Sequence, residues 1–123
     1  MGKYVLNATK TGYTFHLKAG NGETILTSEV YSTKDACENG IESVRKNAPA
    51  ANIEDQTIAG YEEQKHPKFE IYEDKGGKTR FRLVARNGQN IGASEAYNSK
   101  QSCKNGIDSV VHNADSPVVE QEA

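Results

Sequence analysis

Two segments of the chain carry similar sequences, identical at 12 of 21 positions: SEVYSTKDACENGIESVRKNA (residues 28–48) and SEAYNSKQSCKNGIDSVVHNA (residues 94–114). The match extends upstream to Phe15 at an offset of 66 residues, and before that point the offset is 65, so Tyr4 corresponds to Phe69 and Leu6 to Ile71. At the offset of 66, 18 of the 34 positions in residues 15–48 are identical to their counterparts in residues 81–114. Such a repeat indicates two copies of one structural unit, so the fold of the chain follows from this unit and from how its copies pack.

Each copy begins with three predicted strands. Alternating apolar residues predict these strands over 3–8, 13–19 and 24–31 in the first copy and over 68–73, 80–86 and 90–97 in the second. An Asn-Gly pair separates the second and third strands of each copy, at Asn21-Gly22 and Asn87-Gly88. Because both residues tolerate a positive φ, the pair predicts a type I′ hairpin turn.

A helix follows the strands in each copy. The apolar residues of Lys34–Lys46 recur at helical spacing, and so do those of Lys100–His112. The predicted N-caps are Thr33 and Ser99. Gly40 and Gly106 occupy matching positions inside the helices, where glycine costs about 1 kcal/mol relative to alanine. Its presence in both copies predicts that the helix backbone packs closely against a neighbouring group. A short apolar tail predicts a fourth strand.

One copy alone is too small to bury a stable core. A unit of about 60 residues buries only about 60% of the surface of its unfolded chain, and 35% of this 123-residue chain is hydrophobic. We therefore expect residues 1–56 (first repeat) and 68–123 (second repeat), joined by a linker at 57–67, to form a single compact domain. Two such copies predict a monomer with a pseudo-two-fold axis, the tandem equivalent of a dimer.

The second copy, FEIYEDKGGKTRFRLVARNGQNIGASEAYNSKQSCKNGIDSVVHNA (residues 69–114), resembles the YegP-like family of small bacterial proteins. The first copy departs from the family pattern at its start, where Tyr4-Val5-Leu6-Asn7 replaces F-E-I-Y. The resemblance implies an α+β fold in which two tandem β3-αβ repeats merge into one antiparallel sheet with exchanged carboxy-terminal strands. One helix from each repeat then packs on one face of the sheet. The resemblance implies no catalytic residues, because the family's biochemical function is not established.

Composition excludes several classes of function. With 15 basic and 17 acidic residues, the formal net charge is −2, which excludes a protein that binds polyanions through its overall charge. No apolar run approaches the roughly 18 residues of a membrane span, and the sequence begins without the apolar segment of a signal peptide. Two cysteines are few for a secreted disulfide scaffold of this size. We therefore expect a cytoplasmic protein with no membrane partner.

The sequence offers no catalytic or metal-binding constellation. None of the three histidines has metal-ligand spacing to a cysteine or to another histidine: His16, His66 and His112. Cys37 and Cys103 lie on the apolar stripes of the predicted helices, and no histidine recurs in both copies to activate them. A thiol redox enzyme is therefore the least favoured class. We expect no enzyme activity, no metal and no cofactor.

Three polar residues recur at matching positions: Glu29/Glu95, Tyr31/Tyr97 and Asn39/Asn105. Glu29 and Tyr31 lie near Lys34, with which they would form a small polar site at the start of the helix. The simpler interpretation is that Glu29 pairs with Lys34 or accepts hydrogen bonds from backbone N–H groups there, repeated because each copy needs its own internal contacts. Roles of these residues beyond structure stay open at this point.

One asymmetry between the copies favours an alternative function. On the second strand of the second repeat, Arg80, Arg82 and Arg86 are predicted to face outward beside Tyr72. A basic sheet face with an aromatic residue is typical of single-stranded nucleic-acid binding. The simpler interpretation is a solvated face on which Glu70 pairs with an arginine. We expect a small cytosolic non-catalytic structural or binding module, and the alternative is a weak nucleic-acid binder that uses this surface.

Overall fold

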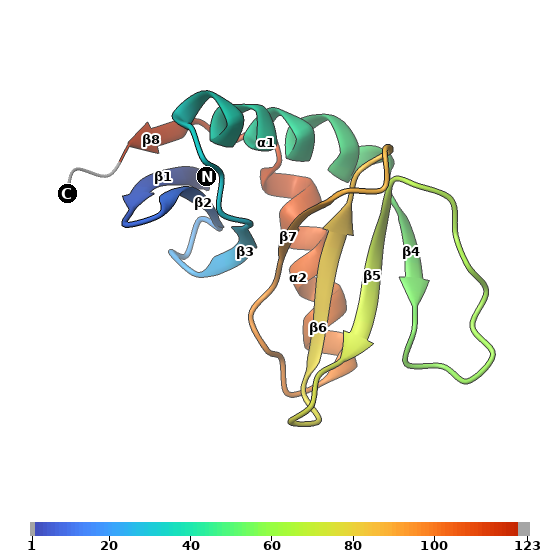
Figure 1. Ribbon diagram of the computed structural model, residues 1–123. Helices are drawn as coiled ribbons and strands as arrows, with labels where there is room; N and C mark the ends of the chain where they lie inside the picture. Colours follow the sequence, from blue (N-terminus) through green and yellow to red (C-terminus); the bar gives the residue numbers. More distant parts are fainter. Residues whose placement is uncertain (1, 121–123) are drawn as a thin grey trace.

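The structure, a computed structural model, describes residues 2–120 (Figure 1). These residues form two helices, one 3₁₀ turn and eight strands, in the following order: β1 (Lys3–Thr9), β2 (Gly12–Lys18), β3 (Thr24–Ser28), α1 (Lys34–Asn47), the 3₁₀ turn Ala48–Ala50, β4 (Asn52–Asp55), β5 (Lys68–Glu73), β6 (Thr79–Val84), β7 (Asn90–Ala93), α2 (Lys100–Asn113) and β8 (Val118–Glu120). The predicted repeats reach Met1 and residues 121–123, which lie outside the described residues. Both predicted helices are confirmed, each one residue longer than expected.

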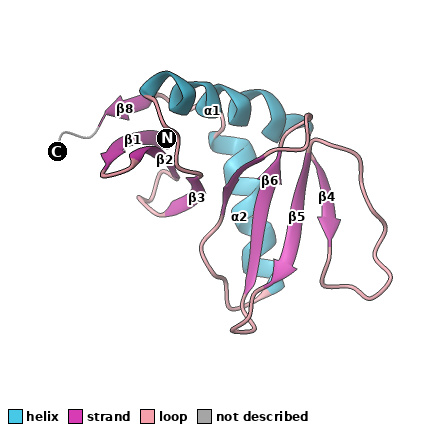
Figure 2. Cartoon of the chain, in the orientation of Figure 1, coloured by secondary structure: helices cyan, strands magenta, loops and turns pink. Residues whose placement is uncertain are grey.

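All eight strands belong to one sheet, in the order β4-β5-β6-β7-β3-β2-β1-β8 (Figure 2). The repeats join at its centre, where β3 pairs with β7 in antiparallel orientation. Thr27 lies opposite Ala93, its own counterpart at the offset of 66. A pseudo-two-fold axis therefore passes between these residues, as the repeat predicts. The two halves of the sheet are strongly twisted relative to each other (Figure 1).

The edges of the sheet confirm the exchanged strands and correct the expected strand direction. β4, from the first repeat, pairs with β5, and β8, from the second repeat, pairs with β1. Both of these pairs are parallel, so the sheet is mixed and the prediction of an antiparallel sheet is wrong at its two edges. A parallel neighbour requires a long return connection. The 12 residues 56–67 between β4 and β5 supply that connection.

The hairpin turns differ from the type I′ prediction. Only Gly22 and Gly88 of the two Asn-Gly pairs have a positive φ, of 88° and 85°. The N–H of Gly22 donates to the carbonyl of Ala19 over 2.9 Å, and the register shifts just before the turn, between Leu17 and Lys18. This is the three-residue hairpin loop, in which a type I turn is followed by a bulged glycine. The asparagine stays at negative φ because its side-chain oxygen accepts the N–H two residues ahead.

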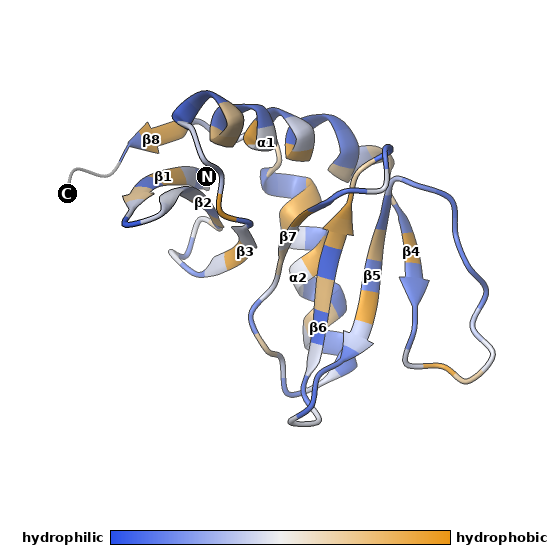
Figure 3. Ribbon diagram, viewed as in Figure 1, coloured by the Kyte–Doolittle hydropathy of each residue, from blue (hydrophilic) through white to orange (hydrophobic). Residues whose placement is uncertain are grey.

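Both helices lie on the same face of the sheet and hold the two repeats together. Their predicted N-caps are confirmed: Thr33 accepts the N–H of Ala36 over 3.0 Å, and Ser99 accepts that of Ser102 over 3.1 Å. α1 contacts β2 and β7, while α2 contacts β6, β2 and β3. Along β5 and β6, hydrophobic residues alternate with hydrophilic ones (Figure 3). The buried apolar side chains of both repeats therefore form one cluster. No helix within residues 2–120 is long and apolar enough to cross a membrane.

The two helical glycines pack as predicted against neighbouring groups. A Cβ atom at Gly40 would lie 2.4 Å from the hydroxyl oxygen of Tyr31, and one at Gly106 would lie 2.3 Å from that of Tyr97. Both distances are far below van der Waals contact. The missing side chain therefore makes room for a tyrosine beneath each helix.

We expect Gly40→Ala to lower the free energy of unfolding by about 1–3 kcal/mol, the usual cost of overpacking. In an open helix the same substitution would stabilise by about 1 kcal/mol. Denaturant unfolding monitored by circular dichroism measures the difference. The neighbouring exposed residue provides the control, because Asn39→Ala should change stability by no more than about 0.5 kcal/mol. A stabilised Gly40→Ala variant would contradict the close packing.

The centre of the sheet also contains an asymmetric contact. Gly92 on β7 is buried against β3, and a Cβ atom there would lie 2.7 Å from the carbonyl oxygen of Thr27. The same atom would lie 3.2 Å from Cγ of Leu26, which is the repeat counterpart of Gly92. One leucine therefore fills space on both sides of the pseudo-two-fold axis.

Candidate functional site

Most of the predicted basic surface is engaged in contacts within the sheet. Arg82 pairs with Glu70 on the adjacent strand β5. Its guanidinium carbon also lies 4.6 Å from the centroid of the Tyr72 ring. Arg80 pairs with Asp74, with 2.8 Å between Nε and Oδ2. The structure thus brings Tyr72, Arg80 and Arg82 to one face, but their charges and the aromatic face are already occupied.

Arg86 does not lie with the other three residues. β6 ends at Val84, and Arg86 follows in the bulged turn, where its N–H donates to Oδ1 of Asn47 over 3.3 Å. The exposed side chain lines a hollow beside the end of α1. The prediction for Arg86 required regular strand alternation up to that residue, and the bulge ends that alternation. This arrangement disfavours the nucleic-acid interpretation, which needs several free cations on one face.

A buried ion pair on the outer face of the sheet was not predicted. Nζ of Lys68 lies 2.8 Å from Oε1 of Glu54, and only 4% and 1% of these side chains are exposed. The linker covers the pair, and the N–H of Gln64 and the amide of Gln56 also donate to Glu54. Burial raises the pKa of Glu54, but the donors outweigh it and hold this pKa at about 2. The pairing depends on parallel β4–β5 contact, which alternation alone does not reveal.

The predicted ion pair between Glu29 and Lys34 is wrong. Lys34 pairs instead with Glu120, and its counterpart Lys100 pairs with Asp55 at 2.9 Å between Nζ and Oδ2. Glu120 and Asp55 belong to the exchanged strands β8 and β4, which bring their carboxylates to the starts of the helices. Glu29 therefore stays exposed, without an ion pair to any residue within 2–120.

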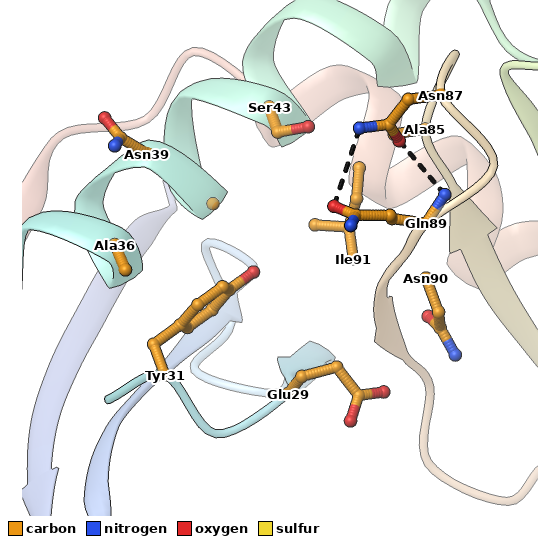
Figure 4. A pocket seen from close by; sticks show the side chains of 11 residues that line it. Glu29, Tyr31, Ala36, Asn39, Ser43, Ala85, Asn87, Gln89, Asn90 and Ile91 are labelled. Atoms are coloured by element: carbon orange, nitrogen blue, oxygen red, sulfur yellow. Dashed lines mark hydrogen bonds between the residues drawn. The ribbon is translucent and has the colours of Figure 1, made fainter. Parts of the chain in front are cut away.

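A hollow of about 570 Å³, which we call the first groove, lies between the two repeats (Figure 4). The first repeat contributes α1 and the segment before it, and the second contributes the β6–β7 turn. Its lining residues are Glu29, Tyr31, Ala36, Asn39, Gly40, Ser43, Ala85, Asn87, Gln89, Asn90 and Ile91. Figure 4 shows the Tyr31 hydroxyl directed into the groove from below and the Ser43 hydroxyl facing Asn87 across it.

A second groove of about 350 Å³ lies at the position related by the pseudo-two-fold axis. Here α2 comes from the second repeat and the β2–β3 turn comes from the first. Its lining residues are Ala19, Asn21, Glu23, Ile25, Tyr97, Ser102, Asn105, Gly106 and Ser109. The exposed Glu95 lies beside it, with Glu23 and Tyr97. Each groove is therefore complete only when both repeats are present.

The tyrosines fix the floor of each groove. The Tyr31 ring stacks on Phe15, with 6.4 Å between centroids and 11° between planes, and Tyr97 stacks on Phe81 in the same way. Burial, more than nearby charges, raises the pKa of both tyrosines, so their hydroxyls stay protonated. Neither hydroxyl has a hydrogen-bond partner within residues 2–120. Each groove thus presents an available hydroxyl donor at its floor.

The cysteines lie outside both grooves. Cys37 and Cys103 are fully buried in the core. Burial, with a smaller contribution from Glu38, raises the pKa of Cys37 to about 11, and burial with Asp55 raises that of Cys103 to about 11. Both thiols are therefore protonated near neutral pH, a state that disfavours thiolate chemistry.

Comparisons with known proteins agree with one another. A domain of unknown function, DUF1508, matches residues 8–55 and again residues 74–120. A UPF0339 protein of Photorhabdus laumondii is 44% identical over 94% of this chain and 90% of its own length. The UPF0339 protein YegP of Yersinia pestis is 44% identical over 97% and 94%. The solution structure of yegP from E. coli, a protein of unknown function, superposes with a TM-score of 0.79 at 38% identity, covering 98% of this chain and 92% of that one.

Proposed function

This chain belongs to the UPF0339 (YegP) family, with two DUF1508 domains in tandem, and we propose that it is a non-catalytic binding module with one ligand site in each inter-repeat groove. Both sites need both domains, since each groove takes its helix from one repeat and its turn from the other. The tandem arrangement is then the functional unit as well as the folding unit.

The identity of the two groove linings carries this proposal. All nine residues that line the second groove are counterparts, at the offset of 66, of residues that line the first. Seven of these nine pairs are identical, and the exceptions are Ala36/Ser102 and Gln89/Glu23. Over all 34 matched positions, only 18 are identical, which is about half. The grooves thus keep the same residues in both copies more strictly than the repeat as a whole.

Folding accounts for only part of this identity. Ser43 accepts a hydrogen bond from Asn47, and Asn87 accepts the N–H of Gln89 within its turn. The Tyr31 hydroxyl, by contrast, has no partner within residues 2–120, and the side chain of Asn39 is exposed. A phenylalanine would stack on Phe15 without that hydroxyl. The duplicated hydroxyl and amide are therefore best explained by contacts to a ligand.

The groove chemistry favours a polar ligand that offers both hydrogen-bond donors and acceptors. Side-chain amides supply both kinds of group, and the first groove contains four of them: Asn39, Asn87, Gln89 and Asn90. The groove-lining residues include neither a cysteine nor a histidine that would serve as a nucleophile or base. This supports recognition without catalysis.

The test is a titration of ¹⁵N-labelled full-length protein with N-acetylglycine methylamide, a probe with two amides. We expect NMR shifts concentrated at both grooves, including the side-chain amides of Asn39 and Asn105. Ser43→Leu should remove the shifts from the first groove alone, and Ser109→Leu should remove them from the second alone. Each variant thus serves as the control for the other. Shifts that scatter over the surface, or that survive both substitutions, would refute the proposal.

A further inference from the structure

The two grooves differ at one end. The first groove continues past Ser43, Ala85 and Asn87 into an adjoining hollow of about 410 Å³, where Lys46 and Arg86 also form the wall. The repeat counterparts of these two basic residues are His112 and Gly20. Of these two grooves, the first therefore ends at a lysine and an arginine, and Glu29 lines its other part.

These cations are available to a ligand. Lys46 and Arg86 are both exposed, and neither forms an ion pair with any residue within 2–120. The arginines Arg45, Arg80 and Arg82 are all paired with carboxylates. Two unpaired cations at the same end of a groove favour a negatively charged group there.

The shape of the extended groove favours a chain over a compact ligand. It follows one face of α1 from Ala36 to Lys46, ten residues that rise by about 15 Å. An extended peptide covers that length with about five residues. The helix side of the groove is lined by small residues, Ala36, Gly40 and Ser43, so a peptide backbone is able to approach the amides of the opposite wall.

Other polymers fit this groove less well. A sugar normally needs an exposed aromatic face, but Tyr31, the aromatic residue in the lining, stacks its ring on Phe15. A nucleic-acid strand would carry a charge at every phosphate, whereas basic residues lie at only one end and Glu29 lies at the other part. An amide backbone with a single acidic end agrees with both observations.

We infer, on the basis of the proposed function, that the first groove binds an extended peptide of about five residues whose acidic side chain or carboxy-terminal carboxylate contacts Lys46 and Arg86. The peptide backbone lies between α1 and the β6–β7 turn and exchanges hydrogen bonds with the groove amides and with the Tyr31 hydroxyl. The second groove, with His112 and Gly20 at the same place, lacks this preference for an acidic end.

Selection from a random heptapeptide library displayed on phage tests the inference with the full-length protein. We expect enriched peptides to carry Asp or Glu at one end, and the Lys46→Glu/Arg86→Glu variant to enrich Lys or Arg there instead. The matched control is His112→Glu, which should keep the acidic preference. A synthetic peptide from the selection should bind roughly tenfold more weakly to the charge-reversed variant, as expected for two ion pairs at a surface. Ser43→Leu should block it and Ser109→Leu should not.

Three outcomes would overturn the inference. The library would show no enrichment over uncoated beads, the acidic preference would persist after charge reversal, or Ser109→Leu would block binding of the selected peptide. A fluorescent single-stranded oligonucleotide is tested in parallel, and if it alone binds in a way that charge reversal abolishes, the groove end recognises phosphate. The amide-probe titration distinguishes a failure of the peptide inference from a failure of the proposed function. If the probe binds at both grooves but no peptide is selected, the proposed function stands and only the peptide inference is refuted.

Discussion

Replacing Lys68 with methionine is expected to lower the free energy of unfolding by about 3–5 kcal/mol at pH 7, because the carboxylate of Glu54 would remain buried without its cation. The pair is almost completely buried under the linker, with 2.8 Å between the charged atoms. Removing both charges, in Glu54→Leu/Lys68→Met, should restore most of the loss, since apolar side chains of similar size replace buried ion pairs well. Denaturant unfolding of the three proteins measures these differences.

The repeat supplies a matched control for this experiment. Lys3 is the counterpart of Lys68 at the offset of 65, and Val119 stands in the place of Glu54. Lys3 is exposed, so Lys3→Met should change the stability by no more than about 0.5 kcal/mol. A Lys68→Met variant that is no less stable than Lys3→Met would show that the buried pair contributes nothing.

The same pair should limit stability in acid. The pKa of Glu54 is lowered from 4.5 to about 2 on folding. A carboxyl group with a lowered pKa stabilises the folded state fully above its unfolded pKa, and this contribution disappears as the pH falls through the folded value. The wild-type protein should therefore lose this contribution between about pH 4.5 and pH 2, and the double variant should show a flatter dependence of stability on pH over that interval.

Separating the repeats should have the larger effect, because it removes the shared core. A fragment of residues 59–123 lacks β4, so Lys68 on β5 loses its buried partner Glu54 and keeps only Glu70, and the sheet loses its centre at β3. We expect this fragment to self-associate or to unfold without cooperativity, and to regain a cooperative transition when residues 1–58 are added. Analytical ultracentrifugation and thermal circular dichroism measure both properties.

A cleaved full-length chain provides the control for the fragments. Gly60 lies in the exposed part of the linker, where nothing packs against it. Cleavage at a protease site inserted there should leave the halves associated, since the cut removes no core contact. A monomeric fragment 59–123 with a cooperative melting transition would contradict the shared core.

The local elements of this fold could be predicted from the sequence because they depend on local signals. Thr33 and Ser99 cap helices whose apolar residues repeat at helical spacing, and Gly40 marks the close contact with Tyr31. Alternation along a strand fixes which face a residue occupies, but not which strand lies beside it. The parallel pairing of β4 with β5 and the buried Glu54–Lys68 pair were missed for this reason.

The grooves were missed because each combines segments that lie far apart in the chain. Tyr31 and Asn87 line the same groove although 56 residues separate them. The repeat did contain a signal: Glu29 and Asn39 recur in the second copy, and both are exposed in the structure. A pair between Glu29 and Lys34 was predicted instead, but Lys34 pairs with Glu120 on the exchanged strand β8. The better guide to the grooves was the recurrence of exposed polar residues in both copies.

The contact between Leu26 and Gly92 gives the two halves distinct identities. Two first repeats facing each other would bring two leucines into space sized for one, and two second repeats would leave that space empty. The two repeats are therefore complementary at this contact, and one cannot replace the other there. In a domain-swapped dimer, a well-packed interface would therefore form only between a first repeat and a second repeat.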